Sequence, residues 1–267
     1  MKEWFFPDRG IYYRTNDFQS GRKTLVFIHG LTGSSSAWFE YEKRFQEDYN
    51  ILTFDLRGHG KSIKPKRYQD YEMQEFVQDV NELVEHLHIE RFTLIGHSFG
   101  TIIALEFLLQ NQTKVESVIF LSPIFNIEKV GWVKIVRALF GWSAGFMRWI
   151  PFSTKIGKHI DYSKYRNTGD WNLRRISADV PNTSLHVYIY CTDYIYRFNS
   201  DDYLNKIYIP ALVVHGKKDT FMPWENIVEE VKKIRKCELL LLDNANHIIV
   251  INNTQEVSQA IEDFTAK

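Results

Sequence analysis

The sequence of 267 residues predicts an α/β protein in which helices flank a mostly parallel sheet. Short apolar runs recur along the chain and are nearly continuous, which is typical of strands buried on both faces. Stretches with apolar residues at helical spacing separate these runs. The alternation stops between residues 124 and 200, which predicts an insert. With 44% hydrophobic residues the chain can bury a large core, so we expect one domain over residues 1–267 that carries this insert.

The predicted strands begin with a hairpin around Trp4–Phe6 and Ile11–Tyr13. The apolar runs that follow predict buried strands at Leu25–Ile28, Ile51–Phe54, Phe92–Ile95, Val118–Leu121, Ala211–Val214 and Leu239–Leu242. Such runs, separated by helices, favour parallel pairing because each crossover covers one face of the sheet.

The predicted helices show apolar stripes with a period near 3.6 residues. One stripe consists of Phe76, Val80, Leu83, Val84 and Leu87, and the next of Ile102, Leu105, Leu108 and Leu109. Further helices are expected over Ile227–Ile234 and Val257–Phe264. Strands that alternate with these helices indicate a sheet covered on both sides.

The insert over residues 124–200 is rich in aromatic residues, and its segment Val130–Phe152 is strongly apolar with scattered basic residues. This segment favours a pair of helices packed on the core, and contact with a lipid surface is the alternative. An aromatic roof over a site indicates a small-molecule substrate with an apolar portion.

Charge and cysteine content argue against several kinds of partner. Lys and Arg total 33, as do Asp and Glu, so no net field would attract nucleic acid. The N-terminus lacks the apolar region of a signal peptide, and no apolar run is long enough to span a bilayer. Cys191 and Cys237 lack metal-site spacing and suit reduced thiols. We therefore expect a cytoplasmic protein without cofactor or metal, of unknown oligomeric state.

The stretch Gly96-His97-Ser98-Phe99-Gly100 lies where a predicted strand meets a predicted helix. A sharp turn there brings the backbone into close contact, which the glycines at both ends tolerate. The turn would hold the Ser98 hydroxyl at the sheet edge, above the N-terminus of the helix, where developing negative charge is stabilised. Ser98 is therefore the candidate nucleophile.

A serine nucleophile needs a base, and the base needs an acid that orients it. Asp219 and His247 each follow a predicted strand, which places them at the same sheet edge as Ser98. The chain order Ser, Asp, His is the order described for this arrangement. Asp243 and Asp193 are weaker candidates for the acid.

The remaining histidines fit structural roles better. His97 is expected to point away from the turn, and His215 to end a strand. His86 and His88 lie at the end of a predicted helix. His159 and His186 lie in the insert, without an evident carboxylate partner.

The stretch His29-Gly30-Leu31 follows a predicted strand and opens a glycine-containing loop. Backbone N–H groups in such a loop suit an oxyanion hole, in which two donors face the oxygen that gains charge. The backbone amides of Leu31 and Phe99 are the predicted pair.

Together these motifs resemble the α/β-hydrolase superfamily: the His29-Gly30 loop, "DLRGHGKS" at 55–62, "GHSFG", "GKKDTFMP" at 216–223 and the closing "ANH". The resemblance spans nearly the whole chain. It implies the α/β-hydrolase fold with a helical cap at 124–200 and a Ser98, His247 and Asp219 triad. It also implies that Asp55, Arg57 and His59 shape a loop near the pocket.

The predicted activity is that of a serine hydrolase for carboxylic esters with an apolar acyl or alcohol portion, similar to a carboxylesterase or lipase. Alternatives are hydrolysis of an amide, a thioester or a carbon–carbon bond, perhydrolysis, and ligand binding without turnover. A serine in place of an aspartate nucleophile argues against dehalogenase and epoxide-hydrolase activity. Thr101, where many relatives have Gly or Ala, is expected to narrow the neighbouring space.

Overall fold

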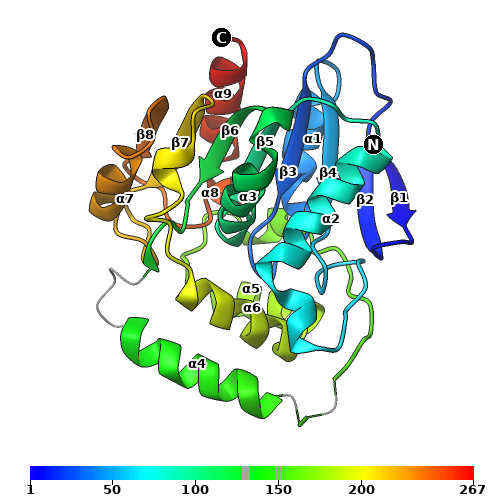
Figure 1. Cartoon of the computed structure of the whole chain (residues 1–267), viewed down its shortest axis with the longest axis vertical. Coiled ribbons are helices and arrows are strands. Elements are labelled where there is room, and N and C mark those ends of the chain that lie inside the picture. The colour runs from blue at the N-terminus through cyan, green and yellow to red at the C-terminus, as the bar shows by residue number, and fades with distance from the viewer. Residues whose placement is uncertain (128–132, 148, 151) are drawn as a thin grey trace.

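A computed structural model of the chain describes residues 1–127, 133–147, 149–150 and 152–267. Its centre is an eight-stranded sheet with the order β1-β2-β4-β3-β5-β6-β7-β8 (Figure 1). The first hairpin is antiparallel and joins β4 antiparallel through β2, whereas every later pairing is parallel. The strand bounds are Lys2–Phe6 (β1), Ile11–Thr15 (β2), Thr24–Ile28 (β3), Asn50–Phe54 (β4), Phe92–His97 (β5), Val115–Leu121 (β6), Ala211–Gly216 (β7) and Cys237–Leu242 (β8).

The helices form a layer on each side of the sheet (Figure 1). One layer contains α2 (Met73–His86), α3 (Phe99–Asn111) and α7 (Trp224–Val231). The other contains α1 (Phe39–Phe45), α8 (Ile249–Asn252) and α9 (Thr254–Thr265). The buried apolar side chains accordingly divide into two clusters, one on each face of the sheet. The predicted α/β class and mostly parallel sheet are confirmed.

Two details of the sequence prediction are wrong. The run Leu239–Leu242 was expected to be buried on both faces, but β8 is an edge strand whose residues alternate between exposed and half-buried, and Leu240 is 37% exposed. The apolar residues of β8 follow instead from its one covered face and from its six-residue pairing with β7. The short helices α1 and α8 were not predicted because neither is long enough to show a helical period.

The segment between β6 and β7 carries helices α4 (Val133–Met147), α5 (Leu173–Thr183) and α6 (Leu185–Arg197). They lie beyond one end of the sheet, below it in Figure 1. An isolated antiparallel bridge pairs Asn126 with Asn199, near the two ends of this segment. We call residues 124–200 the cap.

The apolar segment 130–152 does not form the expected helix pair in its described part, which is one helix, α4, followed by a turn. Residues 130–132, 148 and 151 of this segment lie outside the described residues. One face of α4 packs on α6, where the Phe140 ring lies 5.3 Å from that of Tyr196. The opposite face leaves Leu139, Trp142 and Phe146 exposed.

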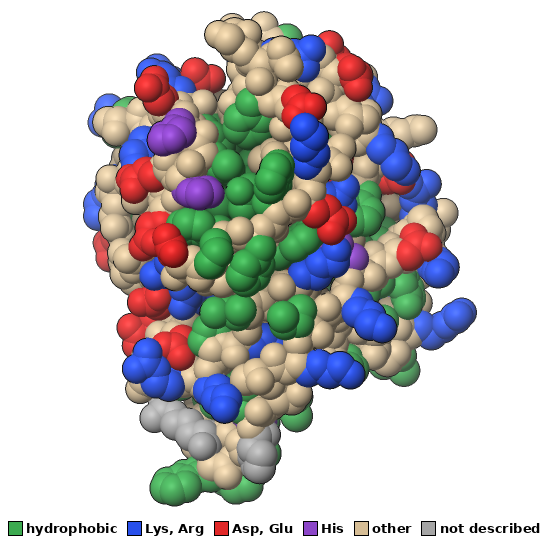
Figure 2. Space-filling model, turned by 90° about the vertical axis from the view of Figure 1, so that its right-hand side faces the viewer, with side chains coloured by type: hydrophobic (Ala, Val, Ile, Leu, Met, Phe, Trp, Pro, Cys, Tyr) green, Lys and Arg blue, Asp and Glu red, His purple; other side chains and the backbone are tan. Residues whose placement is uncertain are grey.

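Figure 2 views the molecule from the side of β1, where hydrophobic side chains lie among charged ones. On that strand Trp4 and Phe5 are about half exposed. Among the described helices, none combines the length and apolar character needed to cross a bilayer.

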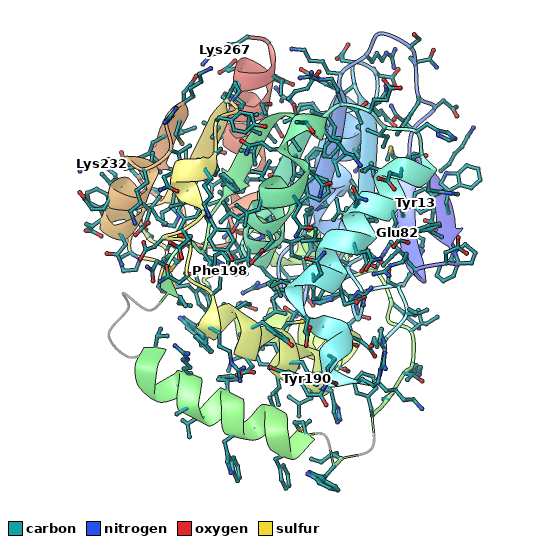
Figure 3. All side chains as sticks on the ribbon, in the orientation of Figure 1. Tyr13, Glu82, Tyr190, Phe198, Lys232 and Lys267 are labelled. Carbon is teal, nitrogen blue, oxygen red and sulfur yellow. The ribbon has the colours of Figure 1, made fainter. Side chains whose placement is uncertain are left out.

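Aromatic packing attaches the cap to the rest of the molecule. The buried ring of Tyr190, labelled on α6 in Figure 3, lies 5.1 Å from the ring of Tyr68.

Candidate active site

Ser98 lies at the turn between β5 and α3 with φ 51° and ψ −116°, a conformation that is strained for a residue with a side chain. The flanking glycines make this turn sterically feasible. A Cβ at Gly96 would lie 2.6 Å from the Gly100 carbonyl oxygen, and one at Gly100 would lie 2.5 Å from that of Ile28. Ser98 is thereby held at the carboxyl end of the parallel strands, as the glycine pattern predicts.

The three residues proposed from sequence form one hydrogen-bonded chain. His247 follows β8, and its Nε2 lies 2.8 Å from the Ser98 Oγ. Its Nδ1 lies 2.7 Å from the Oδ2 of Asp219, which follows β7. Because a carboxylate only accepts, Nδ1 carries the proton and Nε2 is free to accept from the serine hydroxyl. The Asp219 Oδ1 in turn accepts from the backbone N–H groups of Phe221 and Met222 at 2.8 and 3.0 Å.

Burial and charge oppose each other at this pair. Burial alone would lower the pKa of His247, but the charge of Asp219 and the hydrogen bond to it outweigh burial, so the pKa lies above its ordinary value. Burial alone would raise the pKa of Asp219, yet the neighbouring His247 holds it below its ordinary value. Asp219 therefore stays ionised, and the pKa of His247 lies above the ordinary value for histidine.

The competing acids and histidines lie elsewhere or have other partners. Asp243 forms an exposed ion pair with Lys217, and Asp193 pairs with Arg197 on α6. His215 ends β7 as expected, with its Nε2 donating to the Met222 carbonyl at 2.9 Å.

His97 differs from the expectation that it points away from the turn. Its ring lines the cavity at Ser98, and its Nε2 donates to the His247 backbone carbonyl across 3.0 Å. Burial lowers the pKa of His97 to about 3, so this side chain is neutral at physiological pH.

The "DLRGHGKS" motif holds a buried polar network. Arg57 makes two hydrogen bonds of 2.6 Å to Asp79 on α2. Asp55 accepts from the backbone N–H groups of Ser35 and Lys61. It also pairs at 2.9 Å with His159 of the cap, so the expectation that His159 lacks a carboxylate partner is wrong. The loop is thus tied to both the core and the cap.

Phe99 follows Ser98 in the chain, and Leu31 lies in a loop that passes next to it. Phe99 is the first residue of α3, where backbone N–H groups have no partner within the helix. Leu31 follows β3 and lines the cavity at Ser98. A Cβ at Gly30 would lie 3.3 Å from the Ser98 Cβ, so this loop passes directly against the turn.

A cavity of about 210 Å³ opens at Ser98 between the sheet edge and the cap. Its walls are mainly apolar side chains of the cap and of the loop after β7, including Ile124, Ile127, Ile176, Ile195, Trp171 and Phe221. Arg175 and Asp179 of α5 add a charged part to the lining, with a closest approach of 4.0 Å between them.

Thr101 serves a purpose that the sequence did not indicate. Its side chain is buried, and its Oγ1 donates to the Ser98 carbonyl at 2.5 Å and accepts from the Ile124 N–H at 3.2 Å. It links the turn at Ser98 to the start of the cap rather than lining the cavity.

Asp170 is not among the predicted site residues, yet this buried cap residue accepts hydrogen bonds from the backbone N–H groups of Thr220 and His247, in the loops after β7 and β8. No motif surrounds it, and an Asp-Trp pair in an irregular segment gives no periodic signal. In the described part of the chain, acidic, His and Cys side chains do not gather in a group able to hold a metal ion.

Comparisons with known proteins agree with this architecture. A family model described as the alpha/beta hydrolase fold matches residues 23–254. A putative non-heme chloroperoxidase of Synechocystis sp. is 24% identical, covering 95% of this chain and 94% of that protein. Epoxide hydrolase 3 of Xenopus tropicalis is 21% identical over 90% of this chain and 70% of its own length. The solved esterase EaEST from Exiguobacterium antarcticum has a TM-score of 0.72 at 19% identity, covering 96% of each chain.

Proposed function

The chain belongs to the α/β-hydrolase fold family, and from that premise we propose that it is a serine hydrolase for carboxylic esters with an apolar acyl or alcohol portion. The observation that carries the proposal is the approach of His247 Nε2 to the Ser98 Oγ at 2.8 Å, with Asp219 on the opposite ring nitrogen. A hydroxyl becomes a useful nucleophile only when such a base accepts its proton.

In the proposed reaction, Ser98 attacks the carbonyl carbon of the ester while the His247 Nε2 accepts the serine proton. The backbone amides of Leu31 and Phe99 stabilise the resulting oxyanion. His247 then gives the proton to the leaving alkoxide, which departs as the alcohol. Water, deprotonated by the same imidazole, then attacks the acyl carbon, and the bond to Ser98 breaks. The acyl group leaves as the carboxylic acid, and the imidazolium returns its proton to the Ser98 oxygen.

The cavity lining supports an apolar substrate portion. The side chains of Ile124, Ile127 and Ile195 offer a surface to an alkyl or aryl group, and burying such groups is favourable. The volume of about 210 Å³ favours a small substrate.

Two relatives carry names of other activities. The Xenopus tropicalis relative is named an epoxide hydrolase. The resemblance to the α/β-hydrolase superfamily implies an aspartate nucleophile for that activity, and Ser98 at this position argues against it. The putative chloroperoxidase relative makes perhydrolysis a side reaction worth assaying, because peroxide can replace water at the same acyl-enzyme.

Labelling with a fluorophosphonate tests the proposal directly. We expect the wild-type protein to be labelled stoichiometrically at Ser98, as located by peptide mass spectrometry. Ser98→Ala should abolish labelling, and His247→Ala should slow it by orders of magnitude. A folded wild-type protein that resists labelling yet binds apolar ligands would replace the proposal with a non-catalytic binding function.

A further inference from the structure

Asp170 connects the two loops that carry the acid and the base. It lies in the cap between a short 3-10 helix, Tyr162–Tyr165, and α5, and its residue is 4% exposed. Its Oδ1 accepts from the backbone N–H of His247 at 2.9 Å. Its Oδ2 accepts from the N–H and the hydroxyl of Thr220, next to Asp219, at 3.0 and 2.8 Å.

The residues beside Asp170 reinforce the same connection. The Thr168 carbonyl accepts from the side-chain amide of Asn246, and Trp171 Nε1 donates to the Thr220 hydroxyl at 3.0 Å. The Trp171 ring lies 4.7 Å from that of Phe221, which lies 4.8 Å from the His247 ring. The cap segment thus contacts both loops through hydrogen bonds and ring packing.

Asp170 is itself oriented by its own segment. The Arg175 Nη2 donates to the Asp170 carbonyl at 2.6 Å, and the Asn172 side chain accepts from the Arg175 N–H at the start of α5. The carboxylate is therefore placed from the cap side and held from the loop side. A buried carboxylate with three hydrogen bonds resists displacement, because moving it would leave several polar groups unpaired.

We propose that Asp170 is a positioning residue for the reaction: its carboxylate joins the loop after β7 to the loop after β8 and fixes the spacing of Asp219 and His247. The inference rests on the proposed hydrolase function. It makes the cap part of the triad's support as well as the roof of the cavity. Burial lowers the pKa of His247, and Asp219 raises it by more than that. The negative charge of Asp170 raises it further, to a smaller extent than Asp219 does.

The test compares Asp170→Asn with Asp161→Asn, a matched change of an exposed carboxylate in the same cap that accepts from Ser163. Active sites are titrated by the fluorophosphonate burst, and kcat and KM for a p-nitrophenyl ester are measured across pH. We expect Asp170→Asn to lower kcat per titrated site by about 10- to 100-fold with KM little changed. The acid limb of kcat/KM should move to lower pH, because His247 loses a neighbouring negative charge. The Asp161→Asn variant should match the wild type.

Wild-type kcat per titrated site, or an unmoved acid limb, would overturn the inference, even if Asp170→Asn lowers the melting temperature. Where Asp170→Asn fails to fold, Thr220→Val serves instead, because it removes one hydrogen bond to the carboxylate and keeps the charge. It should lower kcat about three- to tenfold without moving the acid limb, and wild-type kcat would contradict the inference. Failure of the proposed function itself would be seen separately, as wild-type protein that is neither labelled nor active.

Discussion

The Nδ1 of His247 donates to the Oδ2 of Asp219 across 2.7 Å, at a site where both side chains are shielded from solvent. This pairing has two consequences. It fixes the tautomer in which the unprotonated Nε2 faces the Ser98 hydroxyl, and in the proposed reaction it would stabilise the imidazolium. The same interaction favours the protonated imidazole before substrate binds, so it would set the pH at which His247 can serve as the proposed base.

The pH dependence of kcat/KM follows from the raised pKa of His247. A protonated imidazole cannot accept the serine proton, so activity should be low at acid pH and rise as pH increases through the pKa. We expect the midpoint of this limb to lie above 6.5, the ordinary value for histidine. The measurement is kcat/KM for a p-nitrophenyl ester between pH 5 and 9, and a midpoint well below 6 would contradict the assignment.

Replacement of Ser98 separates chemistry from backbone strain. Ser98→Ala should lower turnover by about 10⁴- to 10⁶-fold, judging from other serine triads. Ser98→Gly should be equally inactive but more stable than Ser98→Ala, by on the order of 1 kcal/mol, because glycine tolerates φ 51°. Urea unfolding of the two variants provides the comparison. If the alanine variant is the more stable one, the turn is not strained as described.

The sequence predicted most of the sheet because six apolar runs are nearly continuous, as in buried strands, and the helical stripes between them have a clear period. It also identified the side chains that meet at the sheet edge, since Ser98, Asp219 and His247 each follow a strand in a recognisable motif. Their catalytic roles remain predictions. The cap was less predictable: the partners of Asp170 and His159 lie far away in sequence, and nothing local indicates which loop a buried polar side chain will contact.

Asp179 gives a pH-dependent prediction about stability. Burial raises its pKa from 3.8 to about 6, despite hydrogen bonding from Tyr162 and the nearby charge of Arg175. The folded protein therefore holds this proton more tightly than the unfolded chain, and the free energy of unfolding falls as pH rises from about 4 to 6. Asp179→Asn cannot ionise, so it should be more stable than wild type at pH 7.5, by at most about 3 kcal/mol at 1.4 kcal/mol per pKa unit.

The stability of Asp179→Asn is measured by urea unfolding at pH 4.5 and 7.5, with Asp161→Asn as the control. The gain should appear at pH 7.5 and shrink at pH 4.5, whereas the control should gain nothing at either pH. An equal loss of stability at both pH values would show that the carboxylate of Asp179 supports the fold through its hydrogen bonds instead.

The cavity predicts how activity depends on acyl chain length. Each methylene that enters an apolar wall such as that of Ile124, Ile127 and Ile195 contributes about 0.8 kcal/mol, or about fourfold in kcat/KM. A cavity of about 210 Å³ is filled after a few such groups, so kcat/KM should rise from acetyl to medium-length esters and then fall for long chains. A series of p-nitrophenyl esters from acetyl to palmitoyl measures this directly.

Ile195→Phe should move the chain-length optimum toward shorter esters by occupying part of the cavity. Leu240→Phe, a change on the exposed part of β8, should leave the optimum unchanged. A steady decline from acetyl onwards would mean that the apolar lining does not receive the acyl group, and the aromatic cap would then have to cover the alcohol portion of the substrate.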